Sequence, residues 1–187
     1  ETAEEAERLL AAVGDPIEQL LGDRIYSRNG DALEDVIGHL LRGRKQTVAI
    51  AESLTGGQLG QRITSVAGSS TYFLGGFLTY SDEVKTALLG VAPEMLRQHT
   101  AVSAEVAEQM AIGARTRTGA TYAISTTGEA GPESATGAVV GTVYLGYATP
   151  EASGAVRLVM PGDRARVRGF TVNAALDLLR RKLLQIA

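Results

Sequence analysis

Cysteine and tryptophan are absent from this chain of 187 residues, and only two histidines occur, His39 and His99. The lack of cysteine excludes disulfides, thiolate nucleophiles and cysteine-ligated metals, and it is compatible with a reducing cytosol. The two histidines lie far apart, one within a helical pattern and one near a helix end. We therefore expect no metal site, and a Ser-His-Asp triad is poorly supplied.

A long apolar run is also missing, as are the basic and apolar regions of a secretory signal peptide. We therefore expect a cytoplasmic protein with no membrane partner. The formal net charge of -3 gives no basic footprint for neutralising phosphates, so nucleic acid is not an expected partner. The chain begins at Glu1 rather than methionine, which suggests a fragment of a longer protein.

Apolar residues make up 44% of the chain and charged residues 21%, as in an ordinary globular domain. The N-terminal part looks like an appendage. Helical patterns over 2–13 and 16–21 are broken by Gly14-Asp15-Pro16 and followed by a polar connector. We therefore divide the chain into a helical appendage, residues 1–30, and a main domain, residues 31–187.

Helical and strand patterns alternate through the main domain. The predicted strands cover 47–52, 72–80, 120–126, 139–148 and 155–160. The predicted helices cover about 31–43, 55–65, 82–89, a short segment from Pro93, 103–117 and a terminal segment with the apolar stripe Val167, Phe170, Ala174, Leu178 and Ile186. Their expected N-terminal caps include Asp31, Ser81, Ser103 and Asp163.

This alternation predicts an α/β fold, a layered α/β/α sandwich. Its sheet is expected to be mixed, because the last two strands follow each other closely enough to form an antiparallel hairpin.

The most informative junction is Glu52-Ser53-Leu54-Thr55-Gly56-Gly57, which follows a predicted buried strand and leads into a helix. A strand that ends at a serine and turns through glycines presents a hydroxyl and unpaired backbone N–H groups at a sheet edge. Such a place suits acyl chemistry or anion binding. An ordinary helix cap followed by a glycine turn is the alternative interpretation.

Two other junctions, Tyr80 to Lys85 and Thr127 to Pro132, also follow predicted strands. The carboxyl ends of strands in open α/β sheets converge on a ligand crevice. A serine nucleophile there needs a proton acceptor. The candidates are Lys85, Tyr80, Glu52 and Asp82.

Each of these candidates has a plainer alternative. A lysine can act as a base where its surroundings favour the uncharged amine, but a surface lysine on a short helix is also consistent with the pattern. Tyr80 can be the polar-tipped end of a core strand. Arg164 lies in the first turn of the last helix, where the helix dipole disfavours a cation, which indicates either an anionic partner or a plain surface arginine.

Eight motifs occur in order: Glu52-Ser53-Leu54-Thr55-Gly56-Gly57, Gly68-Ser69-Ser70, Thr79 to Lys85, Leu89-Gly90-Val91, Ala101-Val102-Ser103, Thr127 to Pro132, Val140-Gly141-Thr142-Val143 and Pro161-Gly162-Asp163-Arg164. In these motifs the chain resembles the C-terminal domain of CinA, the competence/damage-inducible protein family, which includes nicotinamide mononucleotide deamidases of the PncC type. The resemblance spans about 31–187.

The resemblance implies hydrolysis of nicotinamide mononucleotide to nicotinic acid mononucleotide and ammonia, in pyridine nucleotide recycling. It implies no metal or other cofactor, and a homodimer or higher homo-oligomer. By motif, Ser53 would be the nucleophile and Lys85 its general base, assisted by Tyr80 through hydrogen bonding. Thr127 and Gly128 would bind the substrate or its oxyanion, and Arg164 the negatively charged end of the nucleotide.

The turn after Ser53 supplies the remaining binding candidates, Glu52, Thr55, Gly56 and Gly57. The backbone N–H groups of Thr55 to Gly57 are the expected oxyanion hole, because donors fixed at a helix start need no reorganisation.

The sequence departs from the family pattern at 133–139, where many relatives have a glycine-rich stretch ending in lysine-proline-valine-glycine. A changed loop there can alter phosphate binding. The alternative function is a non-catalytic nucleotide-binding or interaction module of a protein linked to competence or DNA damage. Retention of both Ser53 and Lys85 favours the enzyme, since binding alone needs no such pair.

Overall fold

A single mixed sheet organises the chain in the computed structural model, which describes residues 2–186. Its strand order is β2-β1-β3-β4-β5, with β1 parallel to both neighbours and the β3–β4 and β4–β5 pairs antiparallel. The strands are β1 (Val48–Glu52), β2 (Phe73–Leu78), β3 (Tyr122–Gly128), β4 (Thr142–Ala148) and β5 (Ser153–Val159). The predicted mixed sheet with a late antiparallel pair is confirmed.

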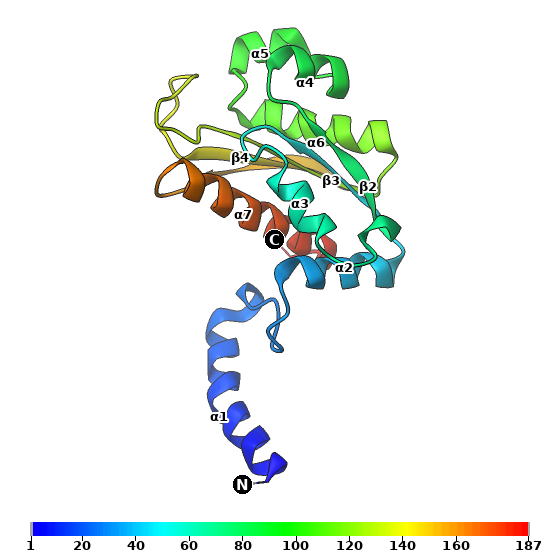
Figure 1. Cartoon of the computed structure of the whole chain (residues 1–187), viewed down its shortest axis with the longest axis vertical. Coiled ribbons are helices and arrows are strands. Elements are labelled where there is room, and N and C mark those ends of the chain that lie inside the picture. The colour runs from blue at the N-terminus through cyan, green and yellow to red at the C-terminus, as the bar shows by residue number, and fades with distance from the viewer. Residues whose placement is uncertain (1, 187) are drawn as a thin grey trace.

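Helices cover both faces of this sheet and make three layers (Figure 1). On one face lie α2 (Leu33–Arg44), α3 (Gln58–Thr64) and α7 (Arg164–Leu184). On the other face lies α6 (Ala104–Thr118), with α4 (Asp82–Leu89) and α5 (Pro93–His99) beyond it. The predicted α/β/α layering is therefore confirmed.

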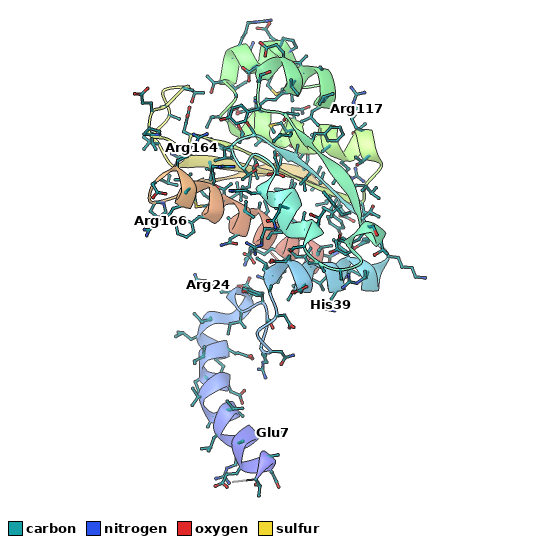
Figure 2. The ribbon with its side chains drawn as sticks, viewed as in Figure 1. Glu7, Arg24, His39, Arg117, Arg164 and Arg166 are labelled. Atoms are coloured by element: carbon teal, nitrogen blue, oxygen red, sulfur yellow. The ribbon has the colours of Figure 1, made fainter. Side chains whose placement is uncertain are left out.

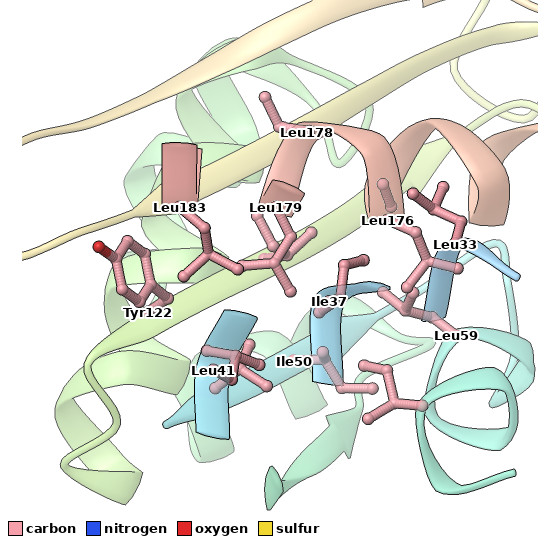
Figure 3. Close-up of a cluster of buried hydrophobic side chains, with 14 of the residues drawn as sticks. Leu33, Ile37, Leu41, Ile50, Leu59, Tyr122, Leu176, Leu178, Leu179 and Leu183 are labelled. Carbon is pink, nitrogen blue, oxygen red and sulfur yellow. The ribbon is translucent and has the colours of Figure 1, made fainter. Parts of the chain in front are cut away.

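The larger core lies between the sheet and the helices α2, α3 and α7 (Figure 3). Side chains of β1, such as Ile50, meet Ile37 of α2 and Leu176 of α7 there. On the opposite face, Ala51 and Met110 belong to a smaller cluster. Because β1 is covered on both faces, its residues form a continuous buried run rather than an alternating one.

The N-terminal appendage differs from the prediction. One helix, α1 (Ala3–Leu21), runs through Pro16 instead of breaking at Gly14, and a short 3₁₀ turn, Gly22–Arg24, follows it. A proline removes one backbone hydrogen bond and bends a helix, and a long exposed helix can accommodate that loss. Figure 1 shows α1 extending away from the sheet, and none of its described residues is buried.

Three of the expected helix caps are confirmed. The side chains of Ser81, Ser103 and Asp163 each accept a hydrogen bond from the backbone N–H three residues later. The cap assigned to Asp31 was wrong: Ala32 occupies that position, and Ser27 Oγ donates to the Asp31 carboxylate at 2.7 Å. A competing local hydrogen bond therefore removed the expected cap.

Two further expectations were wrong in detail. The strand predicted from residue 139 begins at Thr142, because the residues before it belong to the loop that follows β3. On α7, Phe170 is 43% exposed, and the helix ends before Ile186. Val167 and Leu178 of the predicted stripe are buried, and the buried face also includes Thr171 and Ala175.

A two-pronged ion pair joins the helices on the α7 face. Arg62 of α3 donates to both carboxylate oxygens of Glu34 at 2.7 and 2.6 Å, and also to Asn173 of α7 at 3.1 Å. The hydrogen bonds from Arg62 hold the pKa of Glu34 below its ordinary value. A depressed carboxylate pKa contributes stability above the unfolded value of about 4.3, and this contribution is lost as the pH falls through the folded value.

Replacing Glu34 by glutamine is therefore expected to lower the free energy of unfolding at pH 7 by about 1 kcal/mol or less, because the pair is partly exposed. The difference from the unmodified protein should shrink between pH 5 and pH 3. Urea unfolding across this range measures it, with Glu7→Gln on exposed α1 as the control. A loss of equal size at every pH would contradict the role assigned to the charge.

Candidate active site

The turn between β1 and α3 places Ser53 at the edge of the sheet. Ser53 N donates to Thr126 O at 2.9 Å, which continues the register of β1 against β3 for one residue beyond the strand. The chain then turns through Gly56 and Gly57, both with positive φ, 59° and 94°. Gly57, not Ser53, precedes α3. The half-buried Ser53 hydroxyl is therefore not used as a helix cap.

The carboxylate of Glu52 holds this turn from inside. Glu52 is 3% exposed and accepts backbone hydrogen bonds from Gly57, Leu59 and Gly60, at 3.0, 3.1 and 2.9 Å. These bonds occupy both of its oxygens. The carboxylate of Glu52 therefore orients the loop, and the expectation that Glu52 also binds substrate stays a prediction.

Of the expected oxyanion donors, the N–H groups of Thr55 to Gly57, two are bound within the turn. Gly56 N donates to Ser53 O at 3.2 Å, and Gly57 N is bound by Glu52. The Thr55 side chain is fully buried, with Oγ1 at 2.7 Å from Thr126 Oγ1. The backbone N–H groups of Leu54 and Thr55 make none of the hydrogen bonds found within residues 2–186. They are therefore the donors that this turn leaves available.

Lys85 is buried at the second turn of α4, which contradicts the surface interpretation: it is 1% exposed. Its Nζ donates to Tyr80 O and Asp82 Oδ1, both at the long distance of 3.4 Å. No hydrogen bond within residues 2–186 joins it to Ser53 Oγ. Tyr80 thus meets Lys85 through its backbone carbonyl, whereas the resemblance implied assistance by its side chain.

The phenol of Tyr80 instead faces Arg164. Arg164 donates to Tyr80 Oη at 3.1 Å and to Gly131 O at 2.9 Å. The start of α7 therefore connects the segment after β2 with the segment after β3. Because the phenol oxygen accepts this bond, its own proton stays free to be donated.

Thr127 lies beside Ser53, since the register of β1 and β3 pairs Glu52 with Thr126. Its hydroxyl donates to Ala101 O at 2.6 Å. A hydroxyl has one proton and two lone pairs, so Thr127 Oγ1 can only accept a further hydrogen bond in this arrangement. It does not fit the expected role in stabilising an oxyanion, which requires a donor.

The turn before Ala101 is strained. Thr100 has φ 63° and ψ 165°, a backbone region that is essentially restricted to glycine and costs about 1–3 kcal/mol. Three hydrogen bonds hold this turn: Thr100 N to Leu96 O, Ser103 Oγ to Thr100 O, and the bond from Thr127. The strained turn thereby fixes the position of Ala101 O, the carbonyl oxygen that accepts the hydroxyl proton of Thr127.

Glu129 organises the loop after β3, and the sequence analysis did not single it out. Its Oε1 accepts from Ala135 N, Thr136 N and Thr136 Oγ1, at 3.1, 2.7 and 2.7 Å. Burial by itself would raise the pKa of Glu129, but these hydrogen bonds outweigh it and hold the pKa below its ordinary value. The altered segment 133–139 is therefore folded around an ionised carboxylate.

A pocket of about 380 Å³ collects most of the predicted site residues. It is lined by Ser53, Leu54, Tyr80, Asp82, Lys85, Ala101, Val102, Thr127, Gly128, Glu129, Ala130, Glu133, Ala135, Thr136 and Arg164. Glu52, Thr55, Gly56 and Gly57 do not line it. Gly128 is glycine for a packing reason, because a Cβ there would meet Thr142 O at 2.7 Å.

Within residues 2–186, no group of three histidine, aspartate or glutamate side chains is arranged to hold a metal ion. In the same part of the chain, no helix has both the length and the apolar character needed to cross a membrane.

The sheet order, the turn that carries Ser53 and the pocket together define an α/β domain with a polar site at the ends of its parallel strands. The family profile described as CinA C-terminal domain matches residues 30–183, so the chain belongs to this family.

Curated relatives agree with this assignment. A CinA-like protein of Solibacter usitatus is 57% identical over 183 residues, which cover 97% of this chain and 44% of that protein. One of Nostoc punctiforme is 47% identical over 188 residues, covering 96% and 44%. The chain therefore spans less than half the length of these relatives.

Solved structures share the fold. The competence damage-inducible protein A of Klebsiella pneumoniae has 33% sequence identity and a TM-score of 0.79, over 81% of this chain and 95% of that one. A competence/damage inducible protein of Agrobacterium tumefaciens has 34% identity and a TM-score of 0.75, over 82% and 94%.

Replacing Glu129 by glutamine keeps the shape of the side chain but removes its charge. Hydrogen bonds to charged groups are about 1 kcal/mol stronger than neutral ones, so amide exchange in 133–137 should speed up about fivefold. Hydrogen exchange with mass spectrometry measures this. Glu133→Gln, in the exposed part of the same loop, is the control. Unchanged exchange in Glu129→Gln would show that the carboxylate does not hold the loop.

Proposed function

We propose that this domain is an amidohydrolase that converts nicotinamide mononucleotide to nicotinic acid mononucleotide and ammonia by a Ser-Lys mechanism. The observation that carries the proposal is that the hydroxyl-bearing Ser53 and the buried amine of Lys85 line one pocket. The choice of nucleotide follows from the resemblance to the deamidases of the CinA family. The strand-end position of the pocket fits a small-molecule substrate.

In this mechanism Ser53 Oγ attacks the carboxamide carbon while the uncharged amine of Lys85 takes its proton. The proton then passes to the amide nitrogen, the C–N bond breaks, and ammonia leaves an acyl ester on Ser53. Water attacks the ester, Lys85 again accepts and returns a proton, and the acid and free Ser53 result.

The oxyanion formed in each step needs donors close to Ser53. We assign this role to the backbone N–H groups of Leu54 and Thr55, the two that the turn leaves unpaired within residues 2–186. A donor on the residue that follows the nucleophile is the arrangement used in other serine hydrolases. One such donor is worth about 3 kcal/mol of transition-state stabilisation.

The remaining polar groups suit the rest of the substrate. Arg164, at the pocket rim, would meet the phosphate, and the Tyr80 hydroxyl that it positions can donate to the same group. Thr127 Oγ1, as an acceptor beside Ser53, would receive an N–H of the carboxamide. A carboxylate product has no such N–H, so Thr127 would favour the amide over the acid.

The second candidate is a nucleotide-binding module without turnover. Two observations favour it: Ser53 and Lys85 share no hydrogen bond, and Lys85 Nζ is instead paired with Asp82 Oδ1 at 3.4 Å. Catalytic hydrogen bonds often close only when substrate is bound, and so we prefer the enzyme.

We further propose the wider setting of the domain. Residues 1–30 would be the end of a linker from a preceding domain, consistent with a family match that starts at residue 30. Cytoplasmic location, no nucleic-acid partner and a homodimer or higher homo-oligomer remain predictions.

Ser53→Ala should abolish ammonia release from nicotinamide mononucleotide, because the variant lacks the proposed nucleophile. Nucleotide binding, followed by calorimetry, should persist. Ser70→Ala, at an exposed serine outside the pocket, is the control and should release ammonia at the unmodified rate. If the unmodified protein releases ammonia no faster than Ser53→Ala, the binding module is the better description.

Thr127→Val removes the acceptor while keeping the shape of the side chain, and Thr127→Ser keeps it. In the Ser53→Ala background, valine should weaken binding of the amide nucleotide about 5- to 10-fold relative to the acid nucleotide, the cost of about one hydrogen bond. Serine should preserve the ratio. Calorimetric titration with both nucleotides gives the two affinities, and an equal loss for both would contradict the acceptor role.

A further inference from the structure

A second arginine of α7 grips the turn that carries Ser53. Arg168 Nε donates to Leu54 O at 2.9 Å, and its Nη2 donates to Thr55 O at 2.8 Å. These carbonyls belong to the two peptide units that follow the nucleophile. Arg168 lies one helical turn after Arg164, so the start of α7 contacts the segments that follow β1, β2 and β3.

Because a peptide unit is planar and trans, a hydrogen bond that holds its C=O also constrains its N–H. The C=O and N–H of one peptide unit point in opposite directions. When Arg168 holds Leu54 C=O, it also fixes the direction of the Thr55 N–H, which has no partner within residues 2–186. Arg168 also holds Thr55 C=O, and the N–H of the same peptide unit belongs to Gly56, which donates to Ser53 O at 3.2 Å.

The charge of Arg168 is directed at these carbonyls. None of the ion pairs formed within residues 2–186 includes Arg168. A cation that binds a carbonyl oxygen draws electron density from the peptide unit, which makes its N–H a stronger donor. The guanidinium fork also fits two neighbouring acceptors, which a lysine ammonium cannot reproduce.

The turn is shaped to admit the guanidinium. A Cβ on Gly56 would lie 3.0 Å from Arg168 Nη2, and the φ of Gly56, 59°, also favours glycine. On the other side, Glu52 binds N–H groups of the same turn. The loop is therefore held from two sides. The Glu52 carboxylate accepts hydrogen bonds from its N–H groups, and the Arg168 guanidinium donates hydrogen bonds to its carbonyl oxygens.

We infer that Arg168 is a positioning residue, which sets the Ser53 turn and aims the Thr55 N–H as the oxyanion donor. This inference rests on the proposed amidase function. The guanidinium of Arg168 is engaged by two backbone carbonyls of the turn, Leu54 O and Thr55 O, and so it is not assigned a contact with the substrate. It acts through the peptide units that it holds.

The test compares Arg168→Gln and Arg168→Lys with Arg166→Gln. Arg166 is a matched control: it belongs to the same helix, is exposed, and lies on the opposite side of the start of α7 from Arg164 in Figure 2. Three quantities are measured for each variant: kcat and KM for ammonia release, nucleotide affinity in the Ser53→Ala background, and hydrogen exchange of 53–60.

Arg168→Gln should lower kcat about 100-fold, the usual effect of losing an oxyanion donor, and change nucleotide affinity less than about threefold. Exchange of 53–60 should accelerate. Arg168→Lys, which keeps the charge without the fork, should recover part of kcat. The control should behave as the unmodified protein in all three measurements.

The outcomes separate the two claims. Unchanged exchange and unchanged kcat in Arg168→Gln would overturn the positioning role, as would equal losses in the Arg166 control. A parallel loss of kcat and nucleotide affinity would assign Arg168 to binding instead. If the unmodified protein releases no ammonia, the proposed function fails, and faster exchange of 53–60 in Arg168→Gln still supports the hold on the loop.

Discussion

The buried carboxylate of Glu52 is the interaction on which the rest of the site depends. It accepts three backbone N–H groups from the turn and from the first residues of α3. A polar side chain at 3% exposure needs hydrogen-bond partners around it, so the Glu52 carboxylate and the turn depend on each other. The residue that follows Glu52, Ser53, therefore lies at the edge of the sheet.

The parallel direction of three strands explains why residues far apart in sequence meet. β1 is parallel to β2 and β3, so the segments that follow these strands lie at one edge of the sheet. The start of α7 then crosses that edge, where Arg164 and Arg168 bind backbone carbonyls of two of the segments. Asp163 caps α7 and so fixes where the helix that carries these two arginines begins.

The sequence predicted those features that depend on local chemistry. Strand and helix patterns gave the layers, and the caps at Ser81, Ser103 and Asp163 form within three residues of their partners. It also brought Ser53, Lys85 and Thr127 to one edge, because strand ends converge. It failed where a tertiary contact decides the role. Arg168 resembles any helix arginine until its carbonyl partners, 113 and 114 positions away, are known.

The backbone donors illustrate the same limit more sharply. A glycine-rich turn before a helix offers several N–H groups, and the sequence does not say which of them the protein uses itself. Gly56 and Gly57 were the natural choice, yet Ser53 O and Glu52 occupy them. The donors left over are the N–H groups of Leu54 and Thr55, one and two residues after Ser53. An oxyanion hole is therefore defined by the hydrogen bonds that the fold leaves unmade.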